Sequence, residues 1–237
     1  MIRVLIERSS GVAGQRGGLV EGEAHHLRVR RAEDGETVEV RDGEGLIGLG
    51  RLVQAGRRWQ VDVTTADRAS RPAELTLVVG AGDRDRFAWL VEKATELGVT
   101  SVIPLETERT AGVASRVRTQ HLDRLRRHAL EAVKQSGAAW ATRVEEPVSL
   151  DEIAARPIAG QGWVADANGA VVPAAVGKTP LTVVIGPEGG LTADELDRLR
   201  GTGYAAVSLG PHTLRFETAA IAAAAAAVAG RLRRTDG

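Results

Sequence analysis

The spacing of apolar residues divides the chain into two parts with different rhythms. In residues 1–67, short runs of β-forming residues are separated by hairpin-type turn signals at Asp34-Gly35 and Asp42-Gly43. These runs are Ile2–Glu7, Glu36–Arg41, Gly45–Val53 and Trp59–Thr64, with a short helical stretch at Glu21–Arg30 between the first two. Short strands joined by regular turns predict a small β-barrel.

A polar segment with a proline, Arg68–Ala73, is predicted to be a linker, and beyond it strands and helices alternate. The predicted strands are Leu75–Val79, Val99–Leu105, Gly162–Ala165, Leu181–Ile185 and Ala205–Leu209. The predicted helices are Arg84–Leu97 closed by Gly98, Thr119–Gln135, one that begins after Thr192, and about Glu217–Arg234. Such alternation predicts an α/β domain with a largely parallel sheet covered by helices on both faces, so the domains are 1–67 and 74–237.

Two of these strands end in Gly-Pro turns that lead towards helices. The first turn is Gly186–Gly190 and the second begins at Gly210-Pro211. Ligands bind beyond the carboxyl ends of parallel strands, and glycines such as Gly189 let the backbone approach a ligand closely. For the first loop taken by itself, a tight turn that binds no ligand remains the alternative interpretation. The side chains that follow the second loop, those of Arg215, Glu217 and Thr218, favour a binding pocket between both loops.

A capping box and one carboxylate complete this local picture. Thr192 with Glu195 predicts the start of a helix just after the first loop. Asp166 follows a strand run, and it is expected either near the pocket or in a turn with Asn168-Gly169. Lys178 lies in a Gly-Lys-Thr triplet, but Val172 stands where a phosphate-binding loop needs its first glycine, so a polar loop is the preferred interpretation.

These motifs resemble those of the RsmE family, which are ribosomal RNA small-subunit methyltransferases of the SPOUT superfamily. The segments that carry the resemblance are Ile185–Leu191 with Glu195, Leu209–Pro211, Leu214–Ala219, Glu92–Val99, Glu131-Ala132, Gln135–Gly137 and His25–Val29. They extend over almost the whole chain.

The resemblance implies a PUA-like RNA-binding domain at the N-terminus and a C-terminal trefoil knot. It also implies transfer of a methyl group from S-adenosyl-L-methionine to N3 of a uridine in 16S ribosomal RNA, by a homodimer. A cytoplasmic location without a membrane is expected because the first residues show no signal-peptide pattern and the longest apolar run, 219–229, is too short to span a bilayer. The residues expected to bind the cofactor are Ile185, Gly186, Pro187, Glu188, Gly189, Gly190, Leu209, Gly210, Thr213, Leu214 and Thr218.

Three residues are the catalytic candidates. Transfer to a ring nitrogen requires its proton to leave and leaves charge on the neighbouring carbonyl oxygens. Arg215 is expected to stabilise that charge. Glu217 or Glu188 could orient Arg215 or accept the proton, and the sequence does not separate these two roles.

A basic cluster precedes the Asp34-Gly35 turn. It consists of His25, His26, Arg28, Arg30 and Arg31. RNA contact is the favoured interpretation because arginine donates fork-like hydrogen bonds to phosphate, and a solvated helix face is the alternative. A second basic run, at Arg116, Arg118, Arg124, Arg126 and Arg127, is interpreted as a solvated face.

Composition narrows the chemistry further. There is no cysteine, which excludes disulfides and thiolate catalysis, and the five histidines are too scattered to indicate a metal site. With 31 basic and 31 acidic side chains the net charge is zero, which argues against sequence-blind nucleic-acid binding but allows a local patch. The high arginine content is equally compatible with a GC-rich genome.

The sequence also departs from the family pattern. His212, Thr213, Phe216 and Ala138 stand where other residues are usual in the family. These departures bear on RNA contacts more than on the reaction class. Two alternatives stay open. A knotted methyltransferase that acts on transfer RNA is disfavoured by the His25–Arg28 motif, and a non-catalytic RNA-binding protein with the same fold is disfavoured by the intact glycine loops with Arg215 and Glu217.

Overall fold

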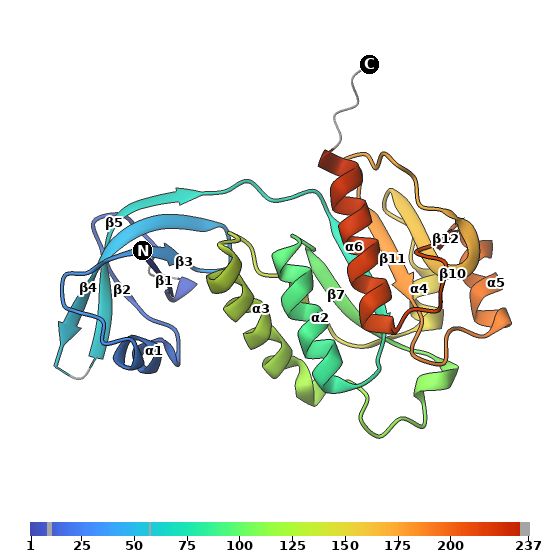
Figure 1. Ribbon diagram of the computed structural model, residues 1–237, viewed down its shortest axis with the longest axis horizontal. Coiled ribbons are helices and arrows are strands. Elements are labelled where there is room, and N and C mark those ends of the chain that lie inside the picture. The colour runs from blue at the N-terminus through green and yellow to red at the C-terminus, as the bar shows by residue number, and fades with distance from the viewer. Residues whose placement is uncertain (9–10, 57, 233–237) are drawn as a thin grey trace, which may run out of the picture. The chain divides into compact units, whose positions relative to one another are not determined.

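A computed structural model describes residues 1–8, 11–56 and 58–232 (Figure 1). The chain forms two compact units. The first consists of Met1–Arg71 together with Leu130–Ala141, and the second of Pro72–Ala129 together with the chain from Thr142 onward. The sequence pattern gave no sign that Leu130–Ala141 groups with the N-terminal unit, because this segment continues the helical periodicity of the preceding residues.

The first unit is built on a five-stranded sheet in the order β1-β3-β4-β5-β2. Its elements are β1 (Ile2–Leu5), β2 (Arg16–Gly18), α1 (Glu23–Val29), β3 (Thr37–Arg41), β4 (Leu46–Ala55) and β5 (Arg58–Arg68). All pairs are antiparallel except β1 with β3. The four predicted strands and the helical stretch are confirmed. The strand β2, Arg-Gly-Gly, was missed because it has no apolar residue to reveal a strand.

The segment Leu130–Ala141 joins this unit through backbone contacts near β4. Gly45 N donates to Ala139 O at 2.8 Å, and Ala141 N donates to Gly43 O at 2.8 Å. Both glycines have positive φ angles, 72° at Gly43 and 101° at Gly45. A Cβ atom on Gly45 would lie 2.5 Å from Trp140, so a side chain there would exclude the tryptophan ring.

The second unit contains a sheet in the order β12-β10-β11-β6-β7-β8, with β9 also paired to β7. Its strands are β6 (Leu75–Gly80), β7 (Ser101–Glu106), β8 (Arg143–Val144), β9 (Val148–Ser149), β10 (Gln161–Val171), β11 (Leu181–Ile185) and β12 (Ala205–Ser208). Every pairing in this sheet is parallel, as the alternation of strands and helices predicted. The two-residue strands β8 and β9 were too short to be found from the sequence.

Helices cover both faces of this sheet (Figure 1). They are α2 (Arg84–Glu96), α4 (Leu150–Ala155), α5 (Ala193–Gly201) and α6 (Phe216–Leu232). The helix α3 (Leu122–Ser136) begins in this unit and ends in the first, and 3-10 turns form η2 (Glu108–Thr110) and η3 (Thr119–His121). A cluster that includes Ile153 of α4 and Leu199 of α5 packs on Val78 and Val184 of the sheet, while α6 contacts α2, β6 and β11. The prediction for the last helix extended to Arg234, which lies outside the described residues.

The alanine-rich helix α6 packs closely on the sheet. Ala220, Ala223, Ala224 and Ala227 are fully buried. Near its end, the chain between β10 and β11 crosses the helix, since Val176 N donates to Gly230 O at 3.2 Å. A Cβ on Gly230 would lie 2.8 Å from the Val176 side chain, so the small residue allows this crossing. Within the described residues, no helix is both long and apolar enough to cross a membrane.

Candidate functional site

A pocket lies at the carboxyl ends of β10, β11 and β12. Its lining residues are Ala165, Asp166, Ala167, Ile185, Gly186, Pro187, Gly190, Leu191, Leu209, Gly210, His212, Thr213, Leu214, Phe216 and Ala219. The two Gly-Pro loops thus form walls of one pocket, as the sequence predicted, and the first turns of α6 close it. This is the edge of a parallel sheet at which ligands bind.

Eight of the residues expected to bind a cofactor line this pocket: Ile185, Gly186, Pro187, Gly190, Leu209, Gly210, Thr213 and Leu214. Glu188, Gly189 and Thr218 lie outside the lining. The expectation that Gly189 lets the backbone approach a ligand closely is wrong. A Cβ at this position would lie 3.1 Å from the Arg109 side chain and would not enter the pocket. Arg109 Nη1 donates a hydrogen bond to Gly189 O, so the arginine covers this side of the loop.

Strand β10 forms one wall of the pocket. It carries Asp166, whose position the sequence left undecided. Its pairing with β12 shifts register between Ala165 and Ala170, and this irregularity brings Asp166 to the pocket. One carboxylate oxygen of Asp166 accepts a hydrogen bond from Asn168 N at 3.0 Å, and the other pairs with Arg200 at 2.7 Å. The expectation that Asp166 lies near the pocket is therefore confirmed, and the alternative of a turn with Asn168-Gly169 is wrong, because these residues continue strand β10.

The remaining lining residues that the sequence analysis did not assign to a cofactor are Ala165, Ala167, Leu191, His212, Phe216 and Ala219. Most are small or apolar and carry no chemical signal of their own. For Leu191, His212, Phe216 and Ala219, proximity to the two Gly-Pro loops in sequence was the only sign available, whereas Ala165 and Ala167 lie on β10, far from both loops in sequence. Their place in the lining follows from the folding of the three strand ends.

The first loop is shaped by contacts between its own backbone groups. Gly190 has a φ angle of 72° and its N–H donates to Pro187 O at 2.7 Å. A Cβ on Gly186 would lie 2.9 Å from Leu191 N, so only glycine fits where the loop folds back on itself. The predicted capping box is confirmed: Thr192 N donates to Glu195 Oε2 at 2.8 Å, and Glu195 N donates to Thr192 Oγ1 at 3.3 Å.

The catalytic candidates surround the start of α6. Arg215 is exposed, whereas Glu217 is buried, with 9% of its surface accessible. Within the described chain, Glu217 Oε2 has no hydrogen-bond partner, and its Oε1 lies 4.0 Å from Arg86 Nε. The expectation that Glu217 orients Arg215 receives no support from these contacts, since its partner is Arg86 of α2. A buried carboxylate with a free oxygen is able to accept a proton or a hydrogen bond.

Glu188 approaches the same region from the first loop. A Cβ added to Gly82 would lie 2.9 Å from each carboxylate oxygen of Glu188. The same Cβ would lie 2.8 Å from Phe216 Cε1. Phe216 in turn stacks on Phe87 of α2, with ring centroids 6.3 Å apart. Glycine at position 82 therefore leaves room for both the carboxylate and the ring.

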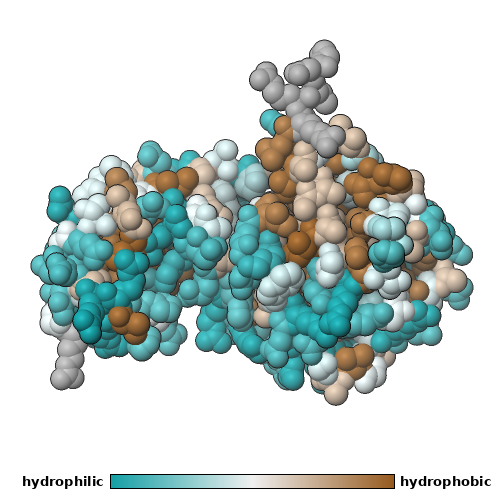
Figure 2. All heavy atoms as spheres, in the orientation of Figure 1, coloured by the Kyte–Doolittle hydropathy of each residue, from teal (hydrophilic) through white to brown (hydrophobic). Residues whose placement is uncertain are grey.

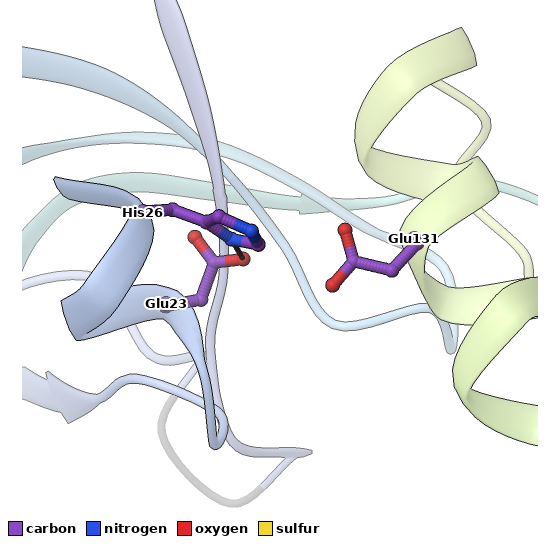
Figure 3. Close-up of side chains that lie close together, drawn as sticks. All are labelled: Glu23, His26 and Glu131. Atoms are coloured by element: carbon purple, nitrogen blue, oxygen red, sulfur yellow. Dashed lines mark ion pairs between the residues drawn. The ribbon is translucent and has the colours of Figure 1, made fainter. Parts of the chain in front are cut away.

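The basic cluster predicted to bind RNA lies on α1 and directly after it. His25, His26, Arg28, Arg30 and Arg31 are all exposed. Figure 3 shows that Glu23 and His26 project from α1 towards Glu131 of α3. Their ligand atoms lie within 4.8 Å of one another, a spacing that could hold a metal ion.

A lysine already neutralises this group. Lys134 Nζ lies 2.7 Å from Glu23 Oε1, 3.0 Å from His26 Nδ1 and 3.8 Å from Glu131 Oε2. The buried Glu23 carboxylate therefore has its counter-charge within the protein. The position between these side chains is occupied by an ammonium group, and the arrangement is a structural ion pair.

Comparisons with known proteins agree with this geometry. Residues 69–228 match the model of an RNA methyltransferase domain, and residues 21–58 match the model of an RNA methyltransferase PUA domain. The ribosomal RNA small subunit methyltransferase E of Aquifex aeolicus is 31% identical over 217 residues, which cover 87% of this chain and 93% of that protein. The class defined by fold and site is thus that of an RNA methyltransferase. The chain belongs to the ribosomal RNA small subunit methyltransferase E family.

Solved structures show the same fold. The methyltransferase E of Neisseria gonorrhoeae, determined with S-adenosyl methionine bound, is 26% identical, superimposes with a TM-score of 0.82 and covers 95% of this chain and 96% of its own. A methyltransferase of Legionella pneumophila, at 23% identity and a TM-score of 0.85 over 98% of both chains, shows the fold alone. The α/β fold with a parallel sheet and a PUA-like N-terminal domain is therefore confirmed.

Proposed function

We propose that this protein transfers a methyl group from S-adenosyl-L-methionine to N3 of a uridine in 16S ribosomal RNA. The observation that carries the proposal is the pocket formed by two glycine-containing loops at the ends of parallel strands. The names of the relatives and the cofactor bound to the Neisseria gonorrhoeae protein support both the substrate and the methyl donor.

The pocket suits a nucleoside cofactor. Its lining combines apolar side chains, such as Ile185, Leu209 and Leu214, with loop backbone groups able to hydrogen-bond an adenine edge. The Asp166 carboxylate adds a polar group at one side. S-adenosyl-L-methionine would supply an electrophilic methyl group attached to a positively charged sulfur.

The residues around the start of α6 would handle the charge and the proton. As N3 forms its bond to the methyl carbon, the N3 proton must leave, and a carboxylate is the available acceptor. We assign this role to Glu217, which is buried with one free oxygen, or to Glu188, which lies beside Phe216. The exposed Arg215 would donate hydrogen bonds to the uracil carbonyl oxygens, which become more negative.

The N-terminal unit would hold the RNA. Its exposed arginines and histidines on and after α1 are suited to phosphate contacts, and the matched PUA model is one found with RNA methyltransferases. The target base would have to be unstacked to enter the pocket. We place this activity in the cytoplasm, where ribosomal RNA is modified.

The active form would be a homodimer that pairs through α6. One face of this helix is buried on the sheet, while the other exposes apolar residues, including Ala225, Ala229 and Leu232, the last with 77% of its surface accessible. Figure 2 shows apolar side chains gathered along α6. Trp89 of the neighbouring α2 is 46% exposed and would extend this surface. A trefoil knot, in which α6 passes through a loop, would accord with the crossing of Val176 over Gly230.

Nucleoside mass spectrometry tests the reaction. Ribosomal RNA from cells that lack this protein should have lost one 3-methyluridine from the 16S fraction, and the purified protein with S-adenosyl-L-methionine should restore it. Loss of a methylated nucleoside from the transfer RNA fraction instead would favour the alternative substrate. An unchanged nucleoside profile in both fractions, with no cofactor binding by calorimetry, would favour a non-catalytic RNA-binding protein.

A further inference from the structure

A second basic site lies on the second unit, around the 3-10 turn η3 and the start of α2. Arg118 N donates a hydrogen bond to His121 Nδ1 at 3.0 Å. Because a neutral imidazole carries one proton, this contact places that proton on His121 Nε2. The Nε2–H group points towards the guanidinium of Arg84, whose Nη1 lies 3.3 Å away.

These contacts bring hydrogen-bond donors together without an acceptor. Guanidinium nitrogens only donate, so Arg84 offers no acceptor to the imidazole N–H. The Gln120 amide nitrogen also lies 3.3 Å from His121 Nε2. If the Gln120 amide were rotated so that its oxygen faced His121 Nε2, the imidazole N–H would gain an acceptor. The Arg84 guanidinium would still have none. Within the described chain, Arg84 and Arg118 form no ion pair with a carboxylate.

The surrounding charges are mostly positive. Arg124 pairs with Asp85 at 2.9 Å, and Arg116 with Glu106 at 3.7 Å, so the nearby carboxylates are already engaged. Partial burial, followed by the charges of Arg84, Arg118 and Arg124, lowers the pKa of His121 below its ordinary value. An anion placed among these donors would relieve their mutual repulsion.

This site lies at the same edge of the sheet as the pocket. Arg84 directly follows the loop after β6, and its N–H donates to Ser115 O at 3.2 Å, which fixes α2 against the chain that leads to η3. Two residues further along α2, Arg86 faces Glu217 at the start of α6. A hollow beside the cluster is lined by Glu106, Arg116, Arg118, Thr119, Gln120 and Pro147.

We propose that Arg84, Arg118 and the imidazole of His121 bind a backbone phosphate of the RNA substrate, close to the nucleotide that enters the pocket. This inference rests on the proposed function, since it assigns part of the same substrate. It adds a contact on the second unit to the RNA contacts proposed for α1. The run of basic residues there was interpreted from the sequence as a solvated face.

Two variants that remove the proposed phosphate donors test the site. The variants are Arg84→Gln and His121→Asn, in which the asparagine oxygen is still able to accept the bond from Arg118 N. The matched control is Arg156→Gln, an exposed arginine that ends α4 and lines a separate hollow with Pro180 and Tyr204. Affinity for unmodified 16S ribosomal RNA is measured over a range of salt concentrations, and cofactor affinity by calorimetry.

The expected result has two parts. Arg84→Gln weakens RNA binding roughly five- to tenfold and reduces the slope of log K against log salt by about one, because one phosphate contact is lost. His121→Asn weakens RNA binding in the same direction. Both variants bind the cofactor as tightly as the wild type, and Arg156→Gln changes neither affinity. The proposal would be overturned if Arg84→Gln and His121→Asn both had the same RNA affinity and the same salt slope as the control Arg156→Gln.

The two proposals fail separately. Wild-type protein that methylates 16S RNA while Arg84→Gln keeps full affinity would remove the phosphate site and leave the function intact. Absence of methylation by the wild type would remove the function, whatever the binding results. NMR of the His121 ring separates the sources of the anion: RNA should shift its resonances, and an equal shift by inorganic phosphate at the same phosphate concentration would overturn the assignment to RNA.

Discussion

The buried carboxylate of Glu195 accepts a hydrogen bond from the backbone N–H of Glu108 at 2.9 Å, although the two residues are 87 positions apart. Its other oxygen accepts from Thr192 N. One side chain therefore caps α5 and fixes the loop after β7 beside the first pocket loop. Arg109, next in sequence to Glu108, then covers Gly189.

This bridge predicts a positioning role for Glu195. Replacing it with Gln exchanges one acceptor oxygen for a donor, so one of the two bonds is lost, at a cost of roughly 1–3 kcal/mol in the free energy of unfolding. We expect weaker cofactor binding as well, because the loop beside the pocket is loosened. The control is Glu152→Gln in the capping box of α4, where Ser149 N donates to Glu152 Oε2 at 2.7 Å. Equal cofactor affinity in the two folded variants would contradict the role.

A substitution at Gly210 tests the pocket directly. Gly210 lines the pocket, its φ angle is not positive, and a Cβ there would meet no atom within 4 Å. Gly210→Val should therefore fold normally, place its side chain in the pocket and reduce cofactor affinity at least tenfold, an order-of-magnitude estimate for steric exclusion. Gly201→Val, also without a neighbour within 4 Å and outside the pocket lining, is the control. Calorimetric titration with the cofactor provides the measurement.

The two faces of α6 predict opposite effects of the same substitution. Ala223 is fully buried against the sheet, so Ala223→Glu should leave an unpaired charge in the core and prevent folding. Ala225 is exposed, so Ala225→Glu should keep the fold and weaken both dimerisation and methyl transfer. Sedimentation at micromolar concentration distinguishes the outcomes. A wild-type monomer with full activity at that concentration would contradict the dimer.

The contacts of Arg231 predict that this side chain contributes strongly to the free energy of unfolding. Its guanidinium donates to Ala73 O at 2.9 Å, to Glu74 O at 2.7 Å and to Thr179 O at 3.1 Å. Arg231→Ala removes the donors for three carbonyl groups that meet where α6 ends, and we expect a loss of roughly 2–4 kcal/mol. Urea unfolding provides the measurement, with the exposed Arg198→Ala as the control. Equal midpoints for the two variants would refute the prediction.

The lowered pKa of His121 predicts a pH dependence of stability. The unfolded chain takes up a proton near the ordinary histidine pKa of about 6.5, whereas the folded protein resists protonation until a lower pH. The part of the folding stability that depends on a neutral His121 is therefore fully present above pH 6.5. It is lost as the pH falls towards the pKa of His121 in the folded protein. His121→Asn should lose less stability than the wild type between pH 7 and pH 5 in urea unfolding. Parallel losses in the two proteins would show that other groups dominate.

The sequence by itself determined the alternation of strands and helices, the two Gly-Pro loops and the capping box at Thr192. These features are local, because strand runs, turn glycines and helix caps depend on neighbouring residues. The strand β11 begins and ends at the predicted residues, Leu181 and Ile185. The motifs of both loops also indicated the family.

Only the tertiary structure decided which of these residues meet. It placed Gly189 under Arg109, paired Glu217 with Arg86, and turned Ala223 inward and Ala225 outward. An alanine helix has no polar face to give its orientation, and a carboxylate has no local preference for one distant arginine over another. The physical reason is that such contacts depend on the packing of segments far apart in the chain, which neither periodicity nor local propensity specifies.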